Sequence, residues 1–350
     1  MTGLYFYRPR PYASGLLGGF PRRKCVVPPR KYNVADSCLT AAWDPCWGRI
    51  IAAFDILHQA PALNTLTLRF TPFPCDYVDA NHEVAVNYSY YQWDIIKTLG
   101  GNRNPLPKLE SLTIRHWISA WEPEFESPYQ APSISSLYQS PSISPLATSL
   151  LHLEFSIPPS DLRRSLEQRI LFWKEVVVEA MLKPVVKLES LRIIGFENFC
   201  VHGCLEEQCF DLSQVPTYPR LDELSLEHVV FEDLTTDEKG IVIPSMVENF
   251  IVRHARTLTK LKLHRCAIKV VKGRTRPFRY WADIFDRLTK ALTKLAELEV
   301  VFGTRDGEMP RYVHVSGGDE EYGGYYRRSE GLEGTEQDEL ALEEFKANIT

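Results

Sequence analysis

One short apolar phrase recurs along the chain and limits the folds that the chain can adopt. Its clearest copy is LESLRI at residues 188–193, an L-x-x-L-x-L pattern whose last three positions alternate apolar, polar and apolar. Six other copies occupy residues 63–68, 109–114, 150–155, 221–226, 258–263 and 295–300. Successive copies begin 33 to 46 residues apart, and their alternation is typical of a half-buried strand. The sequence therefore predicts one strand per repeat.

Helix-forming segments precede most copies of the phrase. Apolar residues recur at three- and four-residue spacing within residues 47–59, 91–99, 162–182, 246–254 and 280–292. A unit of one helix and one strand cannot bury its apolar side alone, so neighbouring units must stack. The pattern predicts an α/β solenoid over residues 44–302, with about seven irregular repeats. Its sheet should be curved and mostly parallel, with helices on the outer face.

The two ends of the chain differ from the repeat region in composition and charge. Residues 1–43 are rich in Pro and Gly, and residues 1–31 hold seven basic residues and no acidic one. Residues 303–350 hold five basic and twelve acidic residues. We expect a basic, disordered lead-in at residues 1–43 and an acidic, mostly flexible tail at residues 303–350. Within that tail, residues 338–347 predict a short helix that either docks back or stays free.

Several classes of protein are disfavoured by the sequence. It contains no apolar run of about 18 residues that would span a membrane, and no secretory signal is recognised at its start. We therefore expect an intracellular protein, cytoplasmic or nuclear, with reduced thiols. The motifs G-x-S-x-G, G-x-x-x-x-G-K-[ST] and H-E-x-x-H are missing. The expectation is a non-enzymatic protein with no cofactor and no catalytic residue.

Two local clusters have competing interpretations. Cys200, His202, Cys204 and Cys209 offer four ligands that zinc accepts, but their close spacing also fits a loop with free thiols. The basic lead-in, with aromatic residues interleaved, fits either a nucleic-acid-binding arm or a plain disordered terminus. A second basic cluster fits a solvated loop as well as a binding patch; it comprises Lys269, Lys272, Arg274, Arg276 and Arg279.

The polar positions of the strand phrases are the main candidates for partner binding. In a stacked repeat the Leu side chains point inward, so the positions between them line the concave face of the sheet. Along the chain these positions change sign repeatedly, which suits a protein with its own patterned charges better than a uniform polyanion. The predicted partner-binding residues are Arg69, Arg115, His152, Arg192, Glu227, Lys262 and His264.

The strand phrases also resemble a known family. The stretches LPKLESLTI, VVKLESLRI, YPRLDELSL and LTKLKLHRC resemble the leucine-rich repeat, and the long, uneven spacing resembles that of fungal F-box-type proteins. The resemblance covers about residues 45–302. Cys266 stands near the position where the standard repeat carries Asn or Cys, whereas the other copies lack such a residue and no F-box is recognisable.

The resemblance implies a role in binding other proteins. The repeats would serve as the substrate-recognition element of an F-box-type ubiquitin-ligase receptor and would hold a protein target on the concave face. A Skp-type adaptor and a cullin would be further partners if an adaptor-binding segment exists. Three alternatives remain: a repeat scaffold or adaptor unconnected with ubiquitin, a nucleic-acid-associated protein that uses the basic N-terminus, and an enzyme, which would require a pocket with perturbed titratable groups.

Overall fold

The structure is a computed structural model, and its description covers part of the chain. The described residues are 2–5, 62–70, 106, 108–117, 149–157, 172–195, 212–231, 235–236, 242–243, 245–270, 277, 279–302, 311–316, 325–328 and 335–349, together with Leu57, Gln92 and Ile95. The four residues of the zinc prediction, Cys200, His202, Cys204 and Cys209, lie outside this set. So do most of the basic lead-in and most of the predicted helices at residues 47–59 and 91–99.

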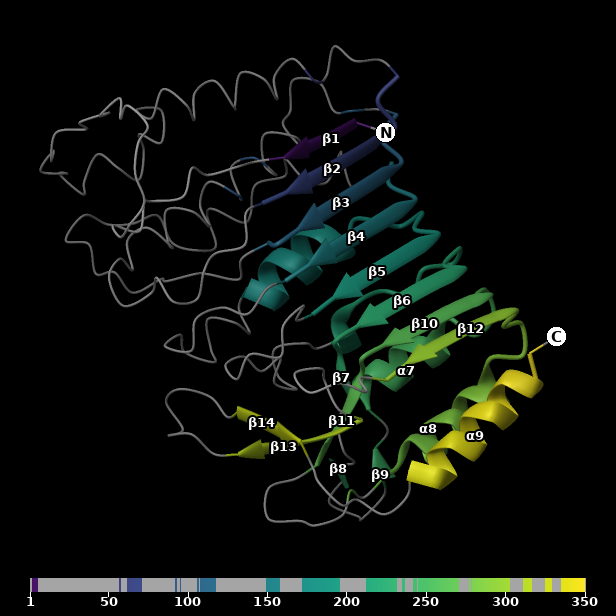
Figure 1. Cartoon of the computed structure of the whole chain (residues 1–350). Coiled ribbons are helices and arrows are strands. Elements are labelled where there is room, and N and C mark those ends of the chain that lie inside the picture. Colours follow the sequence, from purple (N-terminus) through teal and green to yellow (C-terminus); the bar gives the residue numbers. More distant parts are fainter. Residues whose placement is uncertain are drawn as a thin grey trace, which may run out of the picture.

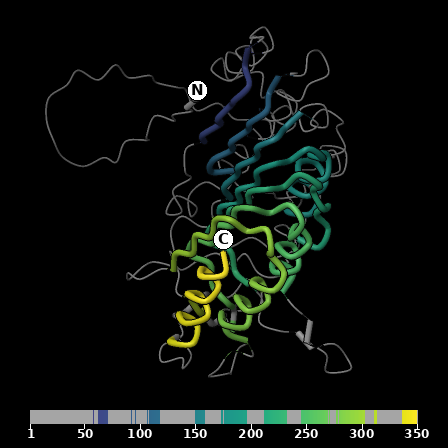
Figure 2. The backbone as a smooth tube through the Cα atoms, turned by 90° about the vertical axis from the view of Figure 1, so that its right-hand side faces the viewer, coloured from purple at the N-terminus to yellow at the C-terminus, as the bar shows by residue number. Residues whose placement is uncertain are grey.

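An eight-stranded parallel sheet forms the centre of the molecule (Figure 1). Its strands, in spatial order, are β1 (Thr2–Tyr5), β2 (Thr65–Arg69), β3 (Ser111–Arg115), β4 (His152–Ser156), β5 (Ser190–Ile194), β6 (Glu223–Glu227), β10 (Lys260–His264) and β12 (Glu297–Val301). Strands β2 to β12 of this sheet confirm the seven predicted strands. Their order in space follows their order in the chain, so each repeat adds one strand beside the previous one (Figure 2).

The alternation of the phrase decides which side chains the sheet buries. Leu66, Leu112 and Leu153 are paired in register, and their exposed fractions are at most 2%. The same register continues through Leu191, Leu224 and Leu261. Burying one such side chain contributes about 2 kcal/mol to folding. Because side chains alternate along a strand, this leucine row directs the polar positions to the opposite face.

The chain turns sharply where the strands end. His116, His228 and Arg265 each follow a strand directly and have φ angles of 60°, 54° and 51°. Such values are uncommon for residues with a Cβ atom, so the same turn is imposed at equivalent points of three repeats. At this position the N–H of His228 donates to the carbonyl of His264 at 2.9 Å, and the N–H of Arg265 donates to that of Val301 at 2.6 Å. These bonds extend the parallel ladder by one residue.

Helices cover the leucine face of the sheet. The π-helix η3 (Phe172–Leu182), the short 3-10 helix η5 (Leu212–Gln214), α7 (Met246–Arg253) and α8 (Trp281–Ala291) contribute side chains to the same apolar core as the strands. The predicted helices at residues 246–254 and 280–292 are confirmed. Of the predicted helix at residues 162–182, only residues 172–182 are described, and these are wound as a π-helix.

Two further sheets lie beyond the ends of the main strands. One contains β7 (Val230–Phe231), β11 (Ala267–Val270), β13 (Tyr312–Ser316) and β14 (Tyr325–Arg328), in the order β14-β13-β11-β7. The other is a pair of two-residue strands, β8 (Thr235–Thr236) and β9 (Val242–Ile243). The strand phrase did not predict these elements, because none of them contains the L-x-x-L-x-L pattern.

Two segments of the predicted acidic tail belong to the packed structure. Strand β13 pairs with β11, and helix α9 (Thr335–Ala347) packs along α8 (Figure 1). Phe345 of α9 is 1% exposed. Asp338 accepts hydrogen bonds from the Tyr312 hydroxyl at 2.6 Å and from the N–H of Ala282 at 2.9 Å, near the N-terminus of α8. Burial raises the pKa of Asp338 above its ordinary value.

Among the described residues, no helix has the length and apolar character needed to cross a membrane. The sheets and helices described above make this part of the chain an α/β structure. Its main parallel sheet is open, with helices over the leucine face and polar side chains on the second face.

Candidate functional site

The polar face of the main sheet gathers the side chains that the sequence singled out. We call this surface the open face, and define it as the first, third and fifth residues of the seven repeat strands. They are Thr65, Thr67, Arg69, Ser111, Thr113, Arg115, His152, Glu154, Ser156, Ser190, Arg192, Ile194, Glu223, Ser225, Glu227, Lys260, Lys262, His264, Glu297, Glu299 and Val301. All seven predicted partner-binding residues lie on it.

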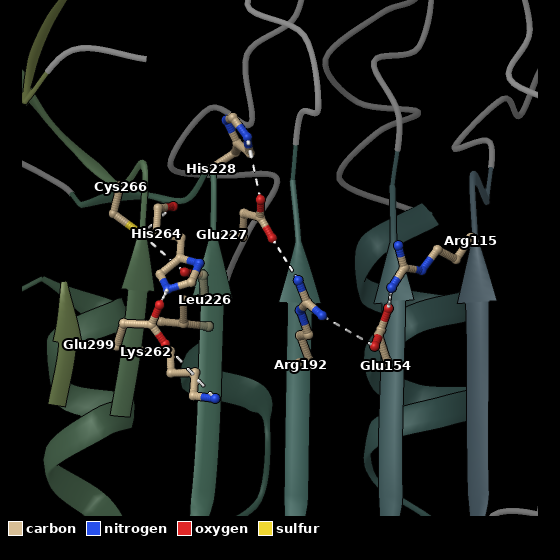
Figure 3. A network of polar contacts seen from close by, with 10 residues as sticks. All are labelled: Arg115, Glu154, Arg192, Leu226, Glu227, His228, Lys262, His264, Cys266 and Glu299. Carbon is tan, nitrogen blue, oxygen red and sulfur yellow. Dashed lines mark hydrogen bonds and ion pairs between the residues drawn. The ribbon is translucent and has the colours of Figure 1, made fainter. Parts of the chain in front are cut away.

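A chain of ion pairs crosses the middle of the open face (Figure 3). Arg115 of β3 pairs with Glu154 of β4, whose second oxygen lies 3.6 Å from Arg192 of β5. Arg192 also donates a hydrogen bond of 2.9 Å to Glu227 of β6. Each pair joins adjacent strands, because the parallel register places these positions beside one another. The side chains alternate in sign, so every charge has an opposite neighbour.

A second group of charges lies on the last three repeat strands. The Lys262 ammonium is 3.6 Å from a Glu223 oxygen, 3.8 Å from one of Glu297 and 3.9 Å from one of Glu299. His264 Nε2 lies 3.0 Å from Glu299. One lysine thus stands among three carboxylates, which leaves this part of the face with an excess of negative charge.

The open face contains a hollow that residues of both groups line. The hollow has a volume of about 290 Å³, and twelve residues from β3, β4, β5, β6, β10 and β12 line it. It therefore runs across the strands, with hydroxyl groups such as those of Ser111 and Ser190 between the charged side chains. A hollow of this size and polarity can receive a few side chains of a partner, whereas cofactor pockets are usually larger and mostly apolar.

The ion pairs of the open face contribute little to stability. The side chains of Arg192 and Arg115 are 37% and 34% exposed, and that of Glu154 is 20% exposed. Ion pairs in such surroundings typically contribute no more than about 1 kcal/mol each, because water and salt screen them. These groups can therefore exchange their internal partners for those of a bound protein at small cost.

The buried titratable groups on the other side of the sheet have structural partners. His254 accepts a hydrogen bond of 3.0 Å from the N–H of Tyr218 at Nε2, so its other nitrogen, Nδ1, carries the proton and donates to Phe250 at 2.8 Å. Burial lowers the pKa of His254 to about 4. Burial also raises the pKa of Cys266 to about 12. The thiol of Cys266 contacts the Leu226 carbonyl at 3.5 Å, a structural use of the sulfur.

The structure corrects the interpretation of one residue of the second basic cluster. Arg279, included in the second basic cluster, is buried and binds both oxygens of Glu248 on α7. It cannot belong to a binding patch, because its guanidinium is buried and bound to that carboxylate.

Trp117, which follows β3, is 1% exposed and belongs to the core. Among the described residues, no group of three or more His, Cys, Asp or Glu side chains is arranged to hold a metal ion.

The predicted partner-binding residues omitted the carboxylates that connect them. Glu154, Glu223 and Glu299 occupy the same phrase positions as the predicted residues, yet were not selected. Their importance lies in pairing across strands, which depends on register and cannot be read from one repeat alone. The in-phase spacing of the phrases is the signal that could have identified them, because it places equivalent positions side by side.

Comparison with known proteins adds no assignment to this geometry. A scan against protein-family models finds no match, and a search of curated proteins finds none either. The functional conclusions below therefore rest on the residues and on their arrangement.

Proposed function

We propose that the chain is a leucine-rich-repeat-like solenoid that binds another protein on its open face. The equivalence of the repeats supports the solenoid. The N–H groups of Glu110, Asp222 and Ala296, each next to a strand, donate to carbonyls of the preceding repeats at 2.8 to 2.9 Å. The same bond at the same phrase position indicates that one structural unit is repeated.

The difference between the two faces of the sheet supports the proposal that the chain binds proteins. The described helices pack against the leucine face, whereas the open face contains a polar hollow lined by side chains of both charge signs. Protein partners match such a surface well, since complementary charge patterns give specificity. We propose that the chemistry associated with this protein belongs to its partners, and that the chain itself is not an enzyme.

Within that class, the proposed role is the substrate-recognition element of an F-box-type ubiquitin-ligase receptor, acting inside the cell. The support is the resemblance of the strand phrases and their spacing to those of fungal F-box-type proteins. The target would occupy the open face, and a separate segment would contact a Skp-type adaptor and through it a cullin. A repeat scaffold without a ligase uses the same surface, so the two roles differ in the adaptor and not in the site.

Affinity capture from a fungal extract, read by mass spectrometry, tests this proposal. The tagged protein is compared with an open-face variant, R115E/R192E, and with a matched helix-side variant, K183E/K290E, which makes the same change in net charge. We expect a Skp-type adaptor and a cullin with all three forms, and substrate proteins that only the open-face variant loses. Capture without ligase components would reject the receptor role. Equal capture by the open-face and helix-side variants would reject the open face as the binding surface.

A further inference from the structure

The open face has a charge polarity along the direction in which the repeats stack. On β2 and β3 its charged residues are Arg69 and Arg115, with no carboxylate. These two arginines lie in register on adjacent strands, a placement that like charges disfavour. On β6, β10 and β12 the open face carries two lysines and four glutamates: Lys260, Lys262, Glu223, Glu227, Glu297 and Glu299. One end of the face is therefore positive and the other is negative.

The two ends are far enough apart to act separately. Four strand-to-strand steps separate β3 from β10, which is about 19 Å at the usual spacing of about 4.8 Å. This distance exceeds the Debye length of about 8 Å at physiological salt. Between the ends, Glu154 and Arg192 carry one charge of each sign, so β4 and β5 add no net charge, and both belong to the ion-pair chain that reaches Arg115 and Glu227. A partner therefore meets a positive end and a negative end, and the hollow runs from β3 into the negative end, where Glu223 and Glu299 line it.

The hollow defines how a partner chain can lie on this face. Its lining residues come from six neighbouring strands, so its long dimension crosses the strands. An extended peptide advances about 3.3 Å per residue, so about six residues reach from the positive end to the negative end. A segment that runs along the hollow can place side chains between the hydroxyl groups and charges of its floor.

We propose that the open face binds an extended peptide segment with acidic residues over β2 and β3 and basic residues over β6, β10 and β12, about six residues apart. This inference rests on the proposed function and specifies the partner chemistry for the same surface. A uniform polyanion would be repelled by Glu297 and Glu299, and a uniform polycation by Arg69 and Arg115. A second copy of the chain fits less well, because two hollowed faces would meet with a void between them.

Fluorescence anisotropy with labelled synthetic peptides tests this polarity on the full chain. The principal probe has an acidic block and a basic block with centres about six residues apart, made in both chain directions. The comparison peptides are a scrambled sequence of the same composition, an all-acidic peptide and an all-basic peptide. We expect at least one direction of the block peptide to bind about tenfold more tightly than the scrambled peptide, because only separated blocks match both ends.

Two neutralising variants locate the ends of the peptide. R69Q/R115Q should weaken binding of the all-acidic peptide and, because it removes repulsion, should not weaken binding of the all-basic peptide, whereas E297Q/E299Q should do the reverse. The control K183Q/K290Q, on the helix side, should change neither, and unfolding curves establish that all variants are folded. Equal affinity for block and scrambled peptides, weakening of the same peptide by both variants, or no peptide binding would overturn the polarity.

The capture experiment separates this inference from the function on which it rests. If R115E/R192E still loses captured proteins while the block peptide binds no more tightly than the scrambled peptide, the proposed polarity is wrong and protein binding on the open face stands. If no captured protein depends on the open face, the function fails as well. Analytical ultracentrifugation of the free chain identifies a self-association through the open face, which would overturn the peptide as its occupant.

Discussion

Arginine and glutamate meet on both sides of the main sheet, in opposite surroundings. On the helix side, Glu248 is fully buried and binds Arg279 and Arg287 of the segment around α8. On the open face, Arg192 is 37% exposed and lies between Glu154 and Glu227. The chemical groups are the same, but only the first set has a carboxylate shielded from water: Glu248 is 0% exposed, whereas Glu154 and Glu227 are 20% and 18% exposed. Burial therefore decides whether such a cluster holds the fold together or remains available to a partner.

The largest difference between the two clusters should appear when one carboxylate is removed from each. Replacement E248Q removes the fully buried carboxylate that Arg279 and Arg287 share and should cost about 3 kcal/mol of unfolding free energy. The matched replacement E227Q on the open face should cost less than about 1 kcal/mol. Urea unfolding of both variants measures the contrast. Equal losses would contradict the distinction between the two sides.

Acid should destabilise the protein through the helix side. The pKa of His254 is lowered to about 4 in the folded chain, whereas its ordinary value is about 6.5. Between pH 6.5 and pH 4, His254 therefore binds a proton in the unfolded chain but not in the folded chain. The free energy of unfolding consequently decreases as the pH decreases. Between pH 7 and pH 5 this residue alone should account for about 2 kcal/mol. The variant H254Q should show a correspondingly smaller loss in urea unfolding at the two pH values, and an identical loss would exclude His254 as the cause.

The docking of helix α9 extends the packed side and should respond to a single hydroxyl. Replacement Y312F removes the group that donates to Asp338 and accepts from the N–H of Trp281 at 3.0 Å. We expect a loss of about 1 to 2 kcal/mol and faster hydrogen exchange across residues 335–347. The control E343Q alters an exposed ion pair of the same helix and should leave exchange unchanged. Unchanged exchange in Y312F would show that this contact does not hold α9.

The smallest effect on stability should accompany the clearest effect on binding. Replacement R192M removes the central charge of the ion-pair chain but keeps much of the side chain's apolar length. Unfolding free energy should change by no more than about 1 kcal/mol, since Glu154 keeps Arg115 as a partner. Binding of the captured substrate proteins should weaken at least about fivefold, as titration calorimetry can measure. A large stability loss with unchanged binding would reverse the roles assigned to the two faces.

The regular parts of the fold were predictable because two periodicities coincide in the sequence. Alternation within each phrase identifies a strand and its buried face, and the recurrence of the phrase identifies neighbouring strands. Leu191 and Arg192 illustrate the first point: adjacent in sequence, they lie on opposite faces, and one is fully buried while the other is half-buried. Helices α7 and α8 were predictable for a similar reason, as their apolar residues recur at helical spacing.

The remaining features depend on contacts that no local pattern encodes. Strand β13 pairs with β11 and β14, and α9 docks through contacts such as that of Asp338 with Tyr312. The burial of Arg279 depends on Glu248, which is 31 residues away in the chain. At the candidate site, residue types could be predicted from phrase positions. Their pairing required the register of neighbouring strands.

The most direct test of the open face as a binding surface is a comparison of dissociation constants for the most abundant captured protein other than the Skp-type adaptor and the cullin. Surface plasmon resonance would measure its affinity for the unaltered chain, for R115E/R192E and for the helix-side variant K183E/K290E. We predict that the open-face variant binds at least about tenfold more weakly, whereas the helix-side variant changes affinity by less than about twofold. Equal affinities for all three forms, or a loss confined to the helix-side variant, would contradict the central claim.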